Sequence, residues 1–251
     1  MIRKNYQFWF FSYPTGYPYP LTAAALRRRM DAINAYYPDH RKIVVMGHSM
    51  GGMISRTLIT DSGMTLWNAI YDKPPEQMPF SAETRKVITS SLIFKHRTDV
   101  SRVIFASPSH RGANMATNFW GRLGSKIIGA PGGIMKNASE ALAVAKPNTT
   151  GQHIQRMPNS IDMLDPKNRF VTTMAKIPLT PGIPFHTLLG DRGKGGNLNH
   201  DPPVSTDGIV PYWSSHLDGA KSELIIPSDH WTHRHPLGIA EVGRILHQHL
   251  K

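Results

Sequence analysis

Short segments dense in apolar residues alternate along this chain with longer segments in which apolar residues recur at helical spacing. The short segments are nearly all apolar, which is typical of strands buried on both faces of a sheet. They cover residues 7–12, 42–46, 102–106, 185–189 and 223–226, so at least five strands are expected. Strands that alternate with helices form βαβ units. The pattern therefore predicts an α/β sandwich, with a mostly parallel central sheet flanked by helices.

Two of the expected helices have defined ends. The first lies between the first two strands, has a basic face at residues 27–29 and stops before Pro38, which cannot continue a helix. Its apolar positions are Leu26, Met30, Ile33 and Tyr37. The last helix follows Pro236, a residue that favours the first helical position. Its expected buried side consists of Ile239, Val242 and Leu246.

Two stretches do not fit a bare sheet and are interpreted as insertions over one face of a single domain that spans residues 1–251. They cover residues 61–101 and 112–163. The second is expected to be a helical, lid-like segment whose apolar residues cover a cleft. Those residues are Trp120, Ile127, Ile128, Ile134 and Met135. The alternative is an ordinary packed helix and loop.

Composition narrows the class of protein. The 251 residues are 40% hydrophobic and 18% charged with 21 glycines, which is normal for a globular chain and excludes disordered, collagen-like and coiled-coil proteins. No apolar run approaches the roughly 18 residues of a membrane span. The apolar part of the N-terminal segment is too short and too aromatic for the core of a signal peptide. A soluble or peripheral protein is expected, with its compartment left open.

Cysteine content and charge limit the chemistry and the partners. With no cysteine, the chain has no disulfide, no thiolate metal cluster and no cysteine nucleophile. A net charge of +12 favours association with anionic surfaces. Because Lys and Arg are scattered rather than gathered into a basic run with aromatic residues, no nucleic-acid partner is expected. Peripheral contact with an anionic membrane surface stays a hypothesis, and the oligomeric state is not predicted.

The sharpest chemical signal is GHSMGG at residues 47–52, directly after an apolar strand and directly before a helical segment. A GxSxG pattern in this context places its serine, Ser49, on a strained turn with the hydroxyl above the sheet edge. Small residues at Gly47 and Gly51 are expected because the turn brings two backbones together. The backbone N–H of Met50 would then face the oxygen of a carbonyl under attack. No cofactor is required.

A serine becomes a nucleophile only when a base takes its proton and an acid orients that base. In this fold class the acid and then the histidine follow the serine along the chain. Asp207, before a glycine in TDGIVPYWSSHL, is the predicted acid, and His230, just after the final strand, is the predicted base. The alternative acids are Asp191, Asp201 and Asp229, and a purely turn-forming role for Asp207 also stays open. The alternative bases are His233 and His235.

The same histidines raise the question of a metal site. The spacing HxxHxH from His230 to His235 would supply imidazole ligands that carboxylates could supplement. No glutamate stands in the position of the base of a hydrolytic zinc site. We therefore predict no metal.

Four segments resemble bacterial serine esterases and lipases of the α/β-hydrolase superfamily, and the resemblance runs through most of the chain. GHSMGG resembles their nucleophile elbow. IFASPSHRGANMA is similar to a strand and loop that in these enzymes often contain the sequence Pro-His-Arg-Gly. TDGIVPYWSSHL resembles their acid loop, and PSDHWTHRHPLGIAEVGRIL resembles their histidine loop and closing helix. The resemblance implies Ser49 as nucleophile, Asp207 as acid, His230 as base and Met50 as oxyanion donor. In this chain Ser109 stands between Pro108 and His110, whereas in the family pattern the proline and the histidine are adjacent.

The N-terminal part departs from that family. Its members place a strand ending in an oxyanion-donating His-Gly loop upstream of the elbow, whereas here one predicted strand and one helix precede Ser49. The chain is therefore expected to be an N-terminally truncated form of a longer hydrolase. Alternatively, SYPTGYP supplies the second oxyanion donor through a backbone N–H near Tyr13.

Together these features predict a serine carboxylic-ester hydrolase that works through an acyl-enzyme. The apolar insertion and the basic surface favour a lipid-like ester. Two alternatives stay open: an acyltransferase with the same three residues, and a catalytically incomplete, hydrolase-like binding protein.

Overall fold

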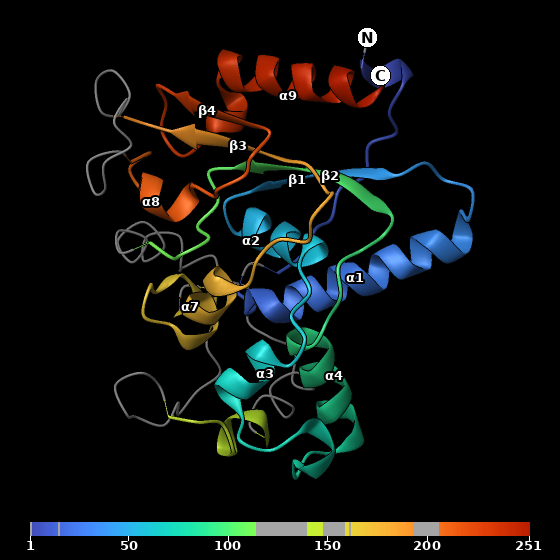
Figure 1. The fold of residues 1–251 in the computed structure, drawn as a ribbon, viewed down its shortest axis with the longest axis vertical. Helices are drawn as coiled ribbons and strands as arrows, with labels where there is room; N and C mark the ends of the chain where they lie inside the picture. Colours follow the sequence, from blue (N-terminus) through green and yellow to red (C-terminus); the bar gives the residue numbers. More distant parts are fainter. Residues whose placement is uncertain (1, 15, 114–139, 148–158, 161, 193–205) are drawn as a thin grey trace.

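Four parallel strands form the sheet of the described structure. The computed structural model describes residues 2–14, 16–113, 140–147, 159–160, 162–192 and 206–251. The strands are β1 (Ile43–His48), β2 (Val100–Ala106), β3 (Phe185–Gly190) and β4 (Ser222–Ile226), and they lie side by side in chain order with every neighbouring pair parallel (Figure 1). The predicted α/β class with a parallel sheet is confirmed.

The prediction of a strand at residues 7–12 was wrong. Residues 7–12 have no regular secondary structure, so the described sheet has four strands rather than at least five. Aromatic residues favour strands only where a neighbouring strand offers backbone hydrogen bonds and a surface to pack on. Here Trp9 packs on the rings of Tyr37 and His40 instead, and Phe10 is 92% exposed. Local aromatic contacts therefore replace strand pairing in this segment.

The two helices with predicted ends are present. Helix α1 (Tyr19–Tyr36) ends next to Tyr37, just before Pro38, and α9 (Pro236–His249) starts at its proline. The predicted buried side of α9 is partly wrong, because Ile239 is exposed whereas Ile245 is fully buried. The helix buries Gly238, Ile245 and Leu246, so its buried stripe is rotated about the helix axis relative to the one that the sequence pattern suggested.

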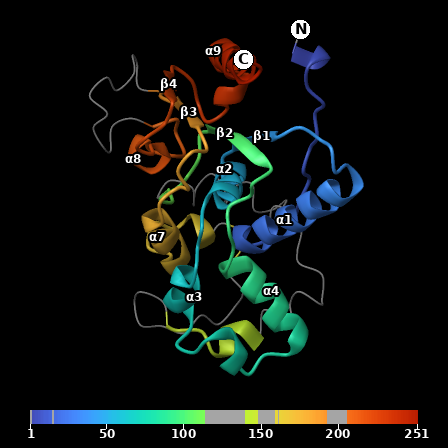
Figure 2. The same cartoon turned by 45° about the vertical axis from the view of Figure 1, so that its right-hand side comes forward.

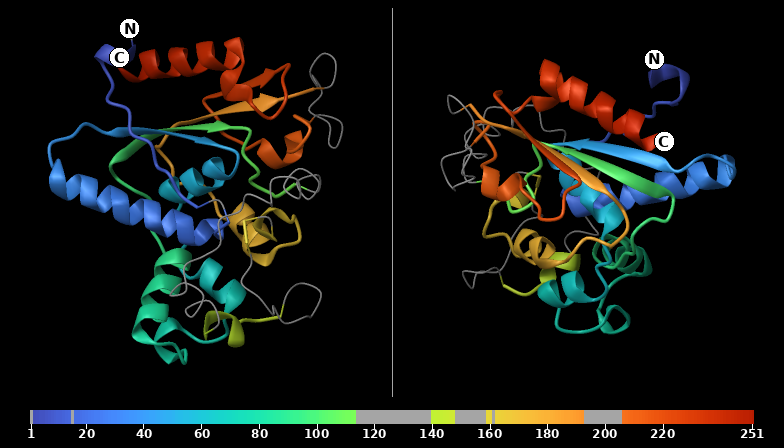
Figure 3. Two further views of the ribbon diagram at one scale, coloured as in Figure 1. Left: turned by 180° about the vertical axis from the view of Figure 1, so that it is seen from behind. Right: turned by 45° about the horizontal axis from the view of Figure 1, so that its top comes forward.

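Helices cover both faces of the sheet (Figures 1 and 3). Successive side chains of a strand point to opposite faces. Accordingly, Val103 and Phe105 of β2 pack in one cluster with Met30 of α1, whereas Ile104 packs on the other face with Ile245 of α9. The central strands β2 and β3 are buried for most of their length, which explains their nearly continuous apolar sequences, whereas the outer strands β1 and β4 are only partly buried.

A helical layer lies on the α1 side of the sheet (Figures 1 and 2). It contains α2 (Met50–Arg56), α3 (Thr65–Ile70), α4 (Ala82–Leu92) and α7 (Arg169–Lys176). The insertion expected at residues 61–101 thus contributes α3 and α4. The shorter elements of the described chain are α8 (Tyr212–Ser215) and the single-turn 3-10 helices Ile2–Lys4, Thr57–Ile59, Pro75–Gln77, Asp162–Leu164 and Thr232–Arg234.

Most of the lid-like insertion expected at residues 112–163 lies outside the described residues, including all five apolar residues named for it. In the part of the chain that is described, no helix combines the length and apolar character needed to cross a bilayer.

Candidate active site

Ser49 occupies a strained turn between β1 and α2. Its φ is 55° and its ψ −122°, a region that non-glycine residues rarely adopt. The backbone N–H of Ser49 donates to the carbonyl oxygen of Ala106, at the end of β2, at 2.9 Å. The side of α2 that follows packs into the core through Met53 and Ile54. The surrounding structure therefore fixes the strained conformation that the GxSxG pattern predicted.

The glycines of the turn have different roles. A Cβ at Gly47 would lie 2.3 Å from the carbonyl oxygen of Gly51, so no larger residue fits at position 47. The expectation that position 51 also requires a glycine was wrong, because a Cβ there would meet only the Tyr13 hydroxyl oxygen, at 4.0 Å. The close approach belongs instead to Gly52, where a Cβ would lie 2.8 Å from Pro108 Cβ. Helix α2 therefore crosses the loop after β2 at Gly52.

Asp207 combines the two roles that the sequence left as alternatives. Its Oδ1 accepts hydrogen bonds from the backbone N–H groups of Ile209 (2.8 Å) and Val210 (2.7 Å), which is the turn-forming role of an Asp residue. The following Gly208 has a φ of 95°, a conformation that favours glycine. These bonds leave Oδ2 pointed at His230. The turn thus orients the carboxylate.

His230 lies in the loop after β4 and is bonded to that carboxylate. Its Nδ1 lies 2.7 Å from Asp207 Oδ2, with 3% of the His230 side chain and 1% of the Asp207 side chain exposed. A carboxylate only accepts hydrogen bonds, so the ring donates from Nδ1 and is held in one orientation. The pair is shielded from solvent, which strengthens its electrostatic interaction.

A second histidine ties the His230 loop to the nucleophile turn. His48, directly before Ser49, donates from Nε2 to the carbonyl oxygen of His230 at 2.8 Å, and the two rings lie 4.8 Å apart. Burial lowers the pKa of His48 to about 4, so this donor is neutral at pH 7. The sequence reasoning missed His48, although it stands inside the motif GHSMGG.

The three loops share one edge of the sheet. Ser49 follows β1, Asp207 lies between β3 and α8, and His230 follows β4. In a parallel sheet the carboxyl ends of all strands lie at the same edge, where ligands of open α/β sheets usually bind. The fold thereby gathers residues that are far apart in the chain.

The alternative acids and bases have other environments. Asp229 is part of the loop surface and accepts a hydrogen bond from the backbone N–H of Trp231. Asp191 is buried at the end of β3. His235 caps helix α9 by accepting the N–H of Leu237 at 3.2 Å, and the His233 ring packs on His48 at 4.3 Å. Asp201 lies outside the described residues.

Two further residues complete the surroundings of the turn. His110 is completely buried and packs edge-on against Phe105, and burial together with the charges of Arg56 and Arg111 holds its pKa well below the usual range. The Tyr13 hydroxyl is the group nearest to a Cβ at Gly51, two residues after Ser49. Burial raises the pKa of Tyr13, so its hydroxyl keeps its proton at neutral pH.

The three histidines of HxxHxH have separate surroundings in the described structure. Within the described ranges, no group of three or more His, Cys, Asp or Glu side chains is arranged to hold a metal ion. His230 is bonded to Asp207 and His235 to the end of α9, so their rings serve different contacts.

Comparisons with known proteins complete the description. No protein-family model matches the chain, and no curated protein matches it significantly. A lipase of Bacillus licheniformis in its mature form is 16% identical, with 92% of this chain and 75% of the lipase covered at a TM-score of 0.46. A metagenomic carboxyl esterase is 13% identical, with 93% and 64% covered at 0.48. Phospholipase PlaB of Legionella pneumophila is 16% identical, with 83% and 36% covered at 0.41.

The chain thus spans about three quarters of the lipase but less than two thirds of the esterase and of the phospholipase. These three solved structures are lipases or esterases.

Proposed function

We propose that this protein is a serine carboxylic-ester hydrolase in which Ser49 is the nucleophile, His230 the general base and Asp207 the orienting acid. The observation that carries the proposal is the buried His230–Asp207 pair, 2.7 Å apart, at the sheet edge where the strained Ser49 turn also ends. A serine hydroxyl is unreactive at neutral pH without such a base, and the base needs its own fixed orientation.

The reaction proceeds in two balanced halves. Ser49 Oγ attacks the ester carbonyl while His230 takes the hydroxyl proton, and that proton then passes to the departing alcohol as the ester C–O bond breaks. The acyl group is now bonded to Ser49. Water attacks this acyl-enzyme as His230 removes a proton, and the acid leaves when Ser49 Oγ regains the proton. Asp207 stabilises the imidazolium of each half without being protonated.

Two groups are proposed to stabilise the oxyanion. Met50 is the first residue of α2, and N–H groups of a first helical turn have no partner within the helix. Its N–H is the first donor. The second is the side-chain hydroxyl of Tyr13, supported by its position 4.0 Å from a Cβ at Gly51, two residues after Ser49. It replaces the backbone N–H near Tyr13 considered from the sequence.

A lipid-like ester is the proposed substrate class. The net charge of +12 favours an anionic interface, and the exposed Phe8, Trp9 and Phe10 supply aromatic side chains of the kind that enter lipid headgroup regions. Hydrolysis rates on p-nitrophenyl esters of increasing chain length, together with sedimentation with anionic vesicles, test this. A preference for acetyl esters combined with no vesicle binding would contradict it.

A fluorophosphonate probe tests the catalytic assignment. We expect one labelled peptide, containing Ser49, and no labelling of Ser49→Ala. The matched control is Ser228→Ala, which removes a hydroxyl from the loop that carries His230 and should label like the unchanged protein. A folded protein that takes up no label would refute an activated Ser49 and favour a hydrolase-like binding protein.

A further inference from the structure

A second cavity lies away from Ser49, Asp207 and His230. Its walls are residues 175–185, which connect α7 to the start of β3, and residues 217–219 and 221, which lead into β4, together with Arg56 and Arg111. It encloses about 710 Å³, within the range of roughly 300–1,000 Å³ found for small-molecule sites. Most of the lining thus precedes β3 and β4, whereas Arg111 belongs to the loop after β2, and none of Ser49, Asp207 and His230 lines the cavity.

One part of the wall is apolar. It consists of Ile177, Pro178, Leu179, Ile183, Pro184, Phe185 and Leu217. Phe185 and Leu217 belong to the core cluster under the sheet, against which Leu179 and Ile183 also pack. An apolar chain placed here would therefore lie on side chains that the fold already holds rigid.

The charged part of the wall is strongly one-sided. Four cationic side chains line the cavity, those of Arg56, Arg111, Lys176 and Lys221. The lining contains one carboxylate, Asp218, whose side chain is 97% exposed and bonded to His216. The cavity thus combines an apolar surface with a positive potential.

Arg56 is the cation that most needs a partner. Only 3% of the residue is exposed, and its Nη2 donates to the carbonyl oxygens of Ala175 (3.3 Å) and Ile177 (3.0 Å). Its Nε and Nη1 are buried and have no hydrogen-bond partner among the described residues. Unpaired donors of a buried charge are costly. Burial also lowers the pKa of Arg56 to about 10, so the group is still charged at neutral pH.

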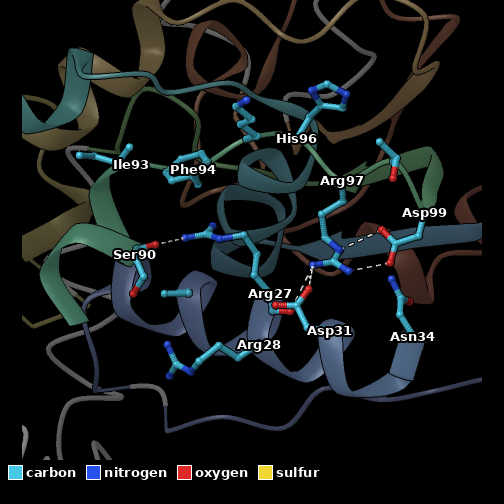
Figure 4. A pocket seen from close by; sticks show the side chains of 13 residues that line it. Arg27, Arg28, Asp31, Asn34, Ser90, Ile93, Phe94, His96, Arg97 and Asp99 are labelled. Atoms are coloured by element: carbon cyan, nitrogen blue, oxygen red, sulfur yellow. Dashed lines mark hydrogen bonds and ion pairs between the residues drawn. The ribbon is translucent and has the colours of Figure 1, made fainter. Parts of the chain in front are cut away.

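The cavity between α1 and α4 shows the opposite arrangement (Figure 4). There Arg97 is paired with Asp99 at 2.7 Å and with Asp31 at 2.6 Å. Arg27 donates to the carbonyl of Ser90 and lies over the Phe94 ring at 4.3 Å. Its two buried or partly buried arginines are satisfied by the protein itself, and that cavity carries no ligand inference.

From these observations we infer that the Arg56 cavity binds an amphipathic oxyanion, a carboxylate or phosphate group attached to an alkyl chain. The headgroup lies toward Arg56, since guanidinium groups are the residues of choice for such anions. Arg111 adds positive charge to the cavity, although its Nη1 already donates to the carbonyl oxygens of Trp213 and His216. The alkyl chain lies along the wall formed by Leu179, Ile183 and Leu217. This site does not depend on Ser49, so it stands or falls separately from the proposed catalysis.

Titration calorimetry with decanoate and with decyl phosphate tests the inference on the whole protein. We expect one molecule bound per chain, at least about tenfold more tightly than decanol or inorganic phosphate, because a charge-assisted hydrogen bond adds about tenfold or more in affinity. The stronger of the two amphipathic ligands identifies the headgroup. Equal binding of decanol, or no binding of either anion below about 1 mM, would overturn the inference.

Substitutions locate the bound anion. Arg56→Met should weaken binding about tenfold or more, with circular dichroism verifying that it folds. Lys221→Glu changes an exposed side chain at the cavity, so it tests the site even if Arg56→Met is unstable, and it should weaken binding severalfold at low salt. Lys86→Glu makes the same charge change on α4, outside the cavity, and should bind like the unchanged protein. If Lys221→Glu and Lys86→Glu bind alike, the anion occupies another place.

Discussion

The Nδ1 atom of His230 lies 2.7 Å from Oδ2 of Asp207, and both side chains are almost completely buried. The other carboxylate oxygen, Oδ1, is held by two backbone N–H groups of the same turn. Each oxygen of Asp207 therefore has a separate function: one builds the turn and the other orients the imidazole.

Asp207→Asn is expected to lower kcat for ester hydrolysis by roughly 10³–10⁴-fold with the fold retained, because an amide can present an N–H to His230 and favour the wrong tautomer. Steady-state kinetics and circular dichroism check this. Asp229→Asn is the matched control, since it makes the same change on an exposed residue next to His230 and keeps an acceptor for the Trp231 N–H. Equal activities of the two variants would contradict the assignment of Asp207.

Tyr13→Phe is expected to lower kcat by about 10²–10³-fold with little change in KM, because an oxyanion donor acts mainly in the transition state. The ring and its stacking on Phe11 are kept, so the free energy of unfolding should change little. Tyr17→Phe removes a hydroxyl nearby in the same segment and should be neutral. A kcat for Tyr13→Phe within about threefold of the unchanged protein would exclude its hydroxyl from the reaction.

Gly47→Ala and Gly51→Ala should differ sharply in stability. The first places a methyl group 2.3 Å from the carbonyl oxygen of Gly51, so we expect a loss of more than about 3 kcal/mol in the free energy of unfolding, or no folded protein. The second meets only the Tyr13 hydroxyl, at 4.0 Å, within a helix that favours alanine, so a change within about 1 kcal/mol is expected. Urea unfolding measures both. Similar losses would mean that the turn is packed differently.

Stability should fall with acid between pH 6.5 and pH 4. Burial, with the nearby Arg102 adding to it, lowers the pKa of His186 to about 4, and burial lowers that of His48 to about 4. Between pH 6.5 and pH 4 these two histidines are protonated in the unfolded chain but neutral in the folded protein. The free energy of unfolding therefore rises with pH in this window. We expect the Tm to drop by at least about 5 °C from pH 7 to pH 5.

His186→Gln provides the matched test of that pH dependence. His186 accepts a hydrogen bond from Arg102 at Nε2 (2.6 Å) and donates from Nδ1 to Ser222, which holds only while the ring is neutral. Glutamine also offers an acceptor and a donor but does not titrate, so its variant should lose less Tm between pH 7 and pH 5. An unchanged dependence on pH would show that other groups dominate it.

Where the pattern along the chain was strong, sequence alone was sufficient. The apolar segments gave β1 to β4 within a few residues, and Pro38 and Pro236 gave the ends of α1 and α9. The strand predicted at residues 7–12 was wrong because aromatic composition cannot reveal whether a neighbouring strand is available. Ile239 misled because a helical period fixes the spacing of a buried stripe more firmly than the angle at which the helix meets its sheet.

For the site, the sequence by itself selected Ser49, through a glycine-flanked turn between a strand and a helix, and narrowed the acid and the base to a few residues. It already preferred Asp207 and His230, but the hydrogen bond that supports this proposed pair joins two separate loops and is seen only in the tertiary structure. The same is true of the His48 bond, of the Tyr13 hydroxyl and of the Arg56 nitrogens that have no partner among the described residues. The conformation of a turn depends on neighbouring residues and can be predicted from them, whereas contacts between distant segments form only once the sheet has brought those segments together.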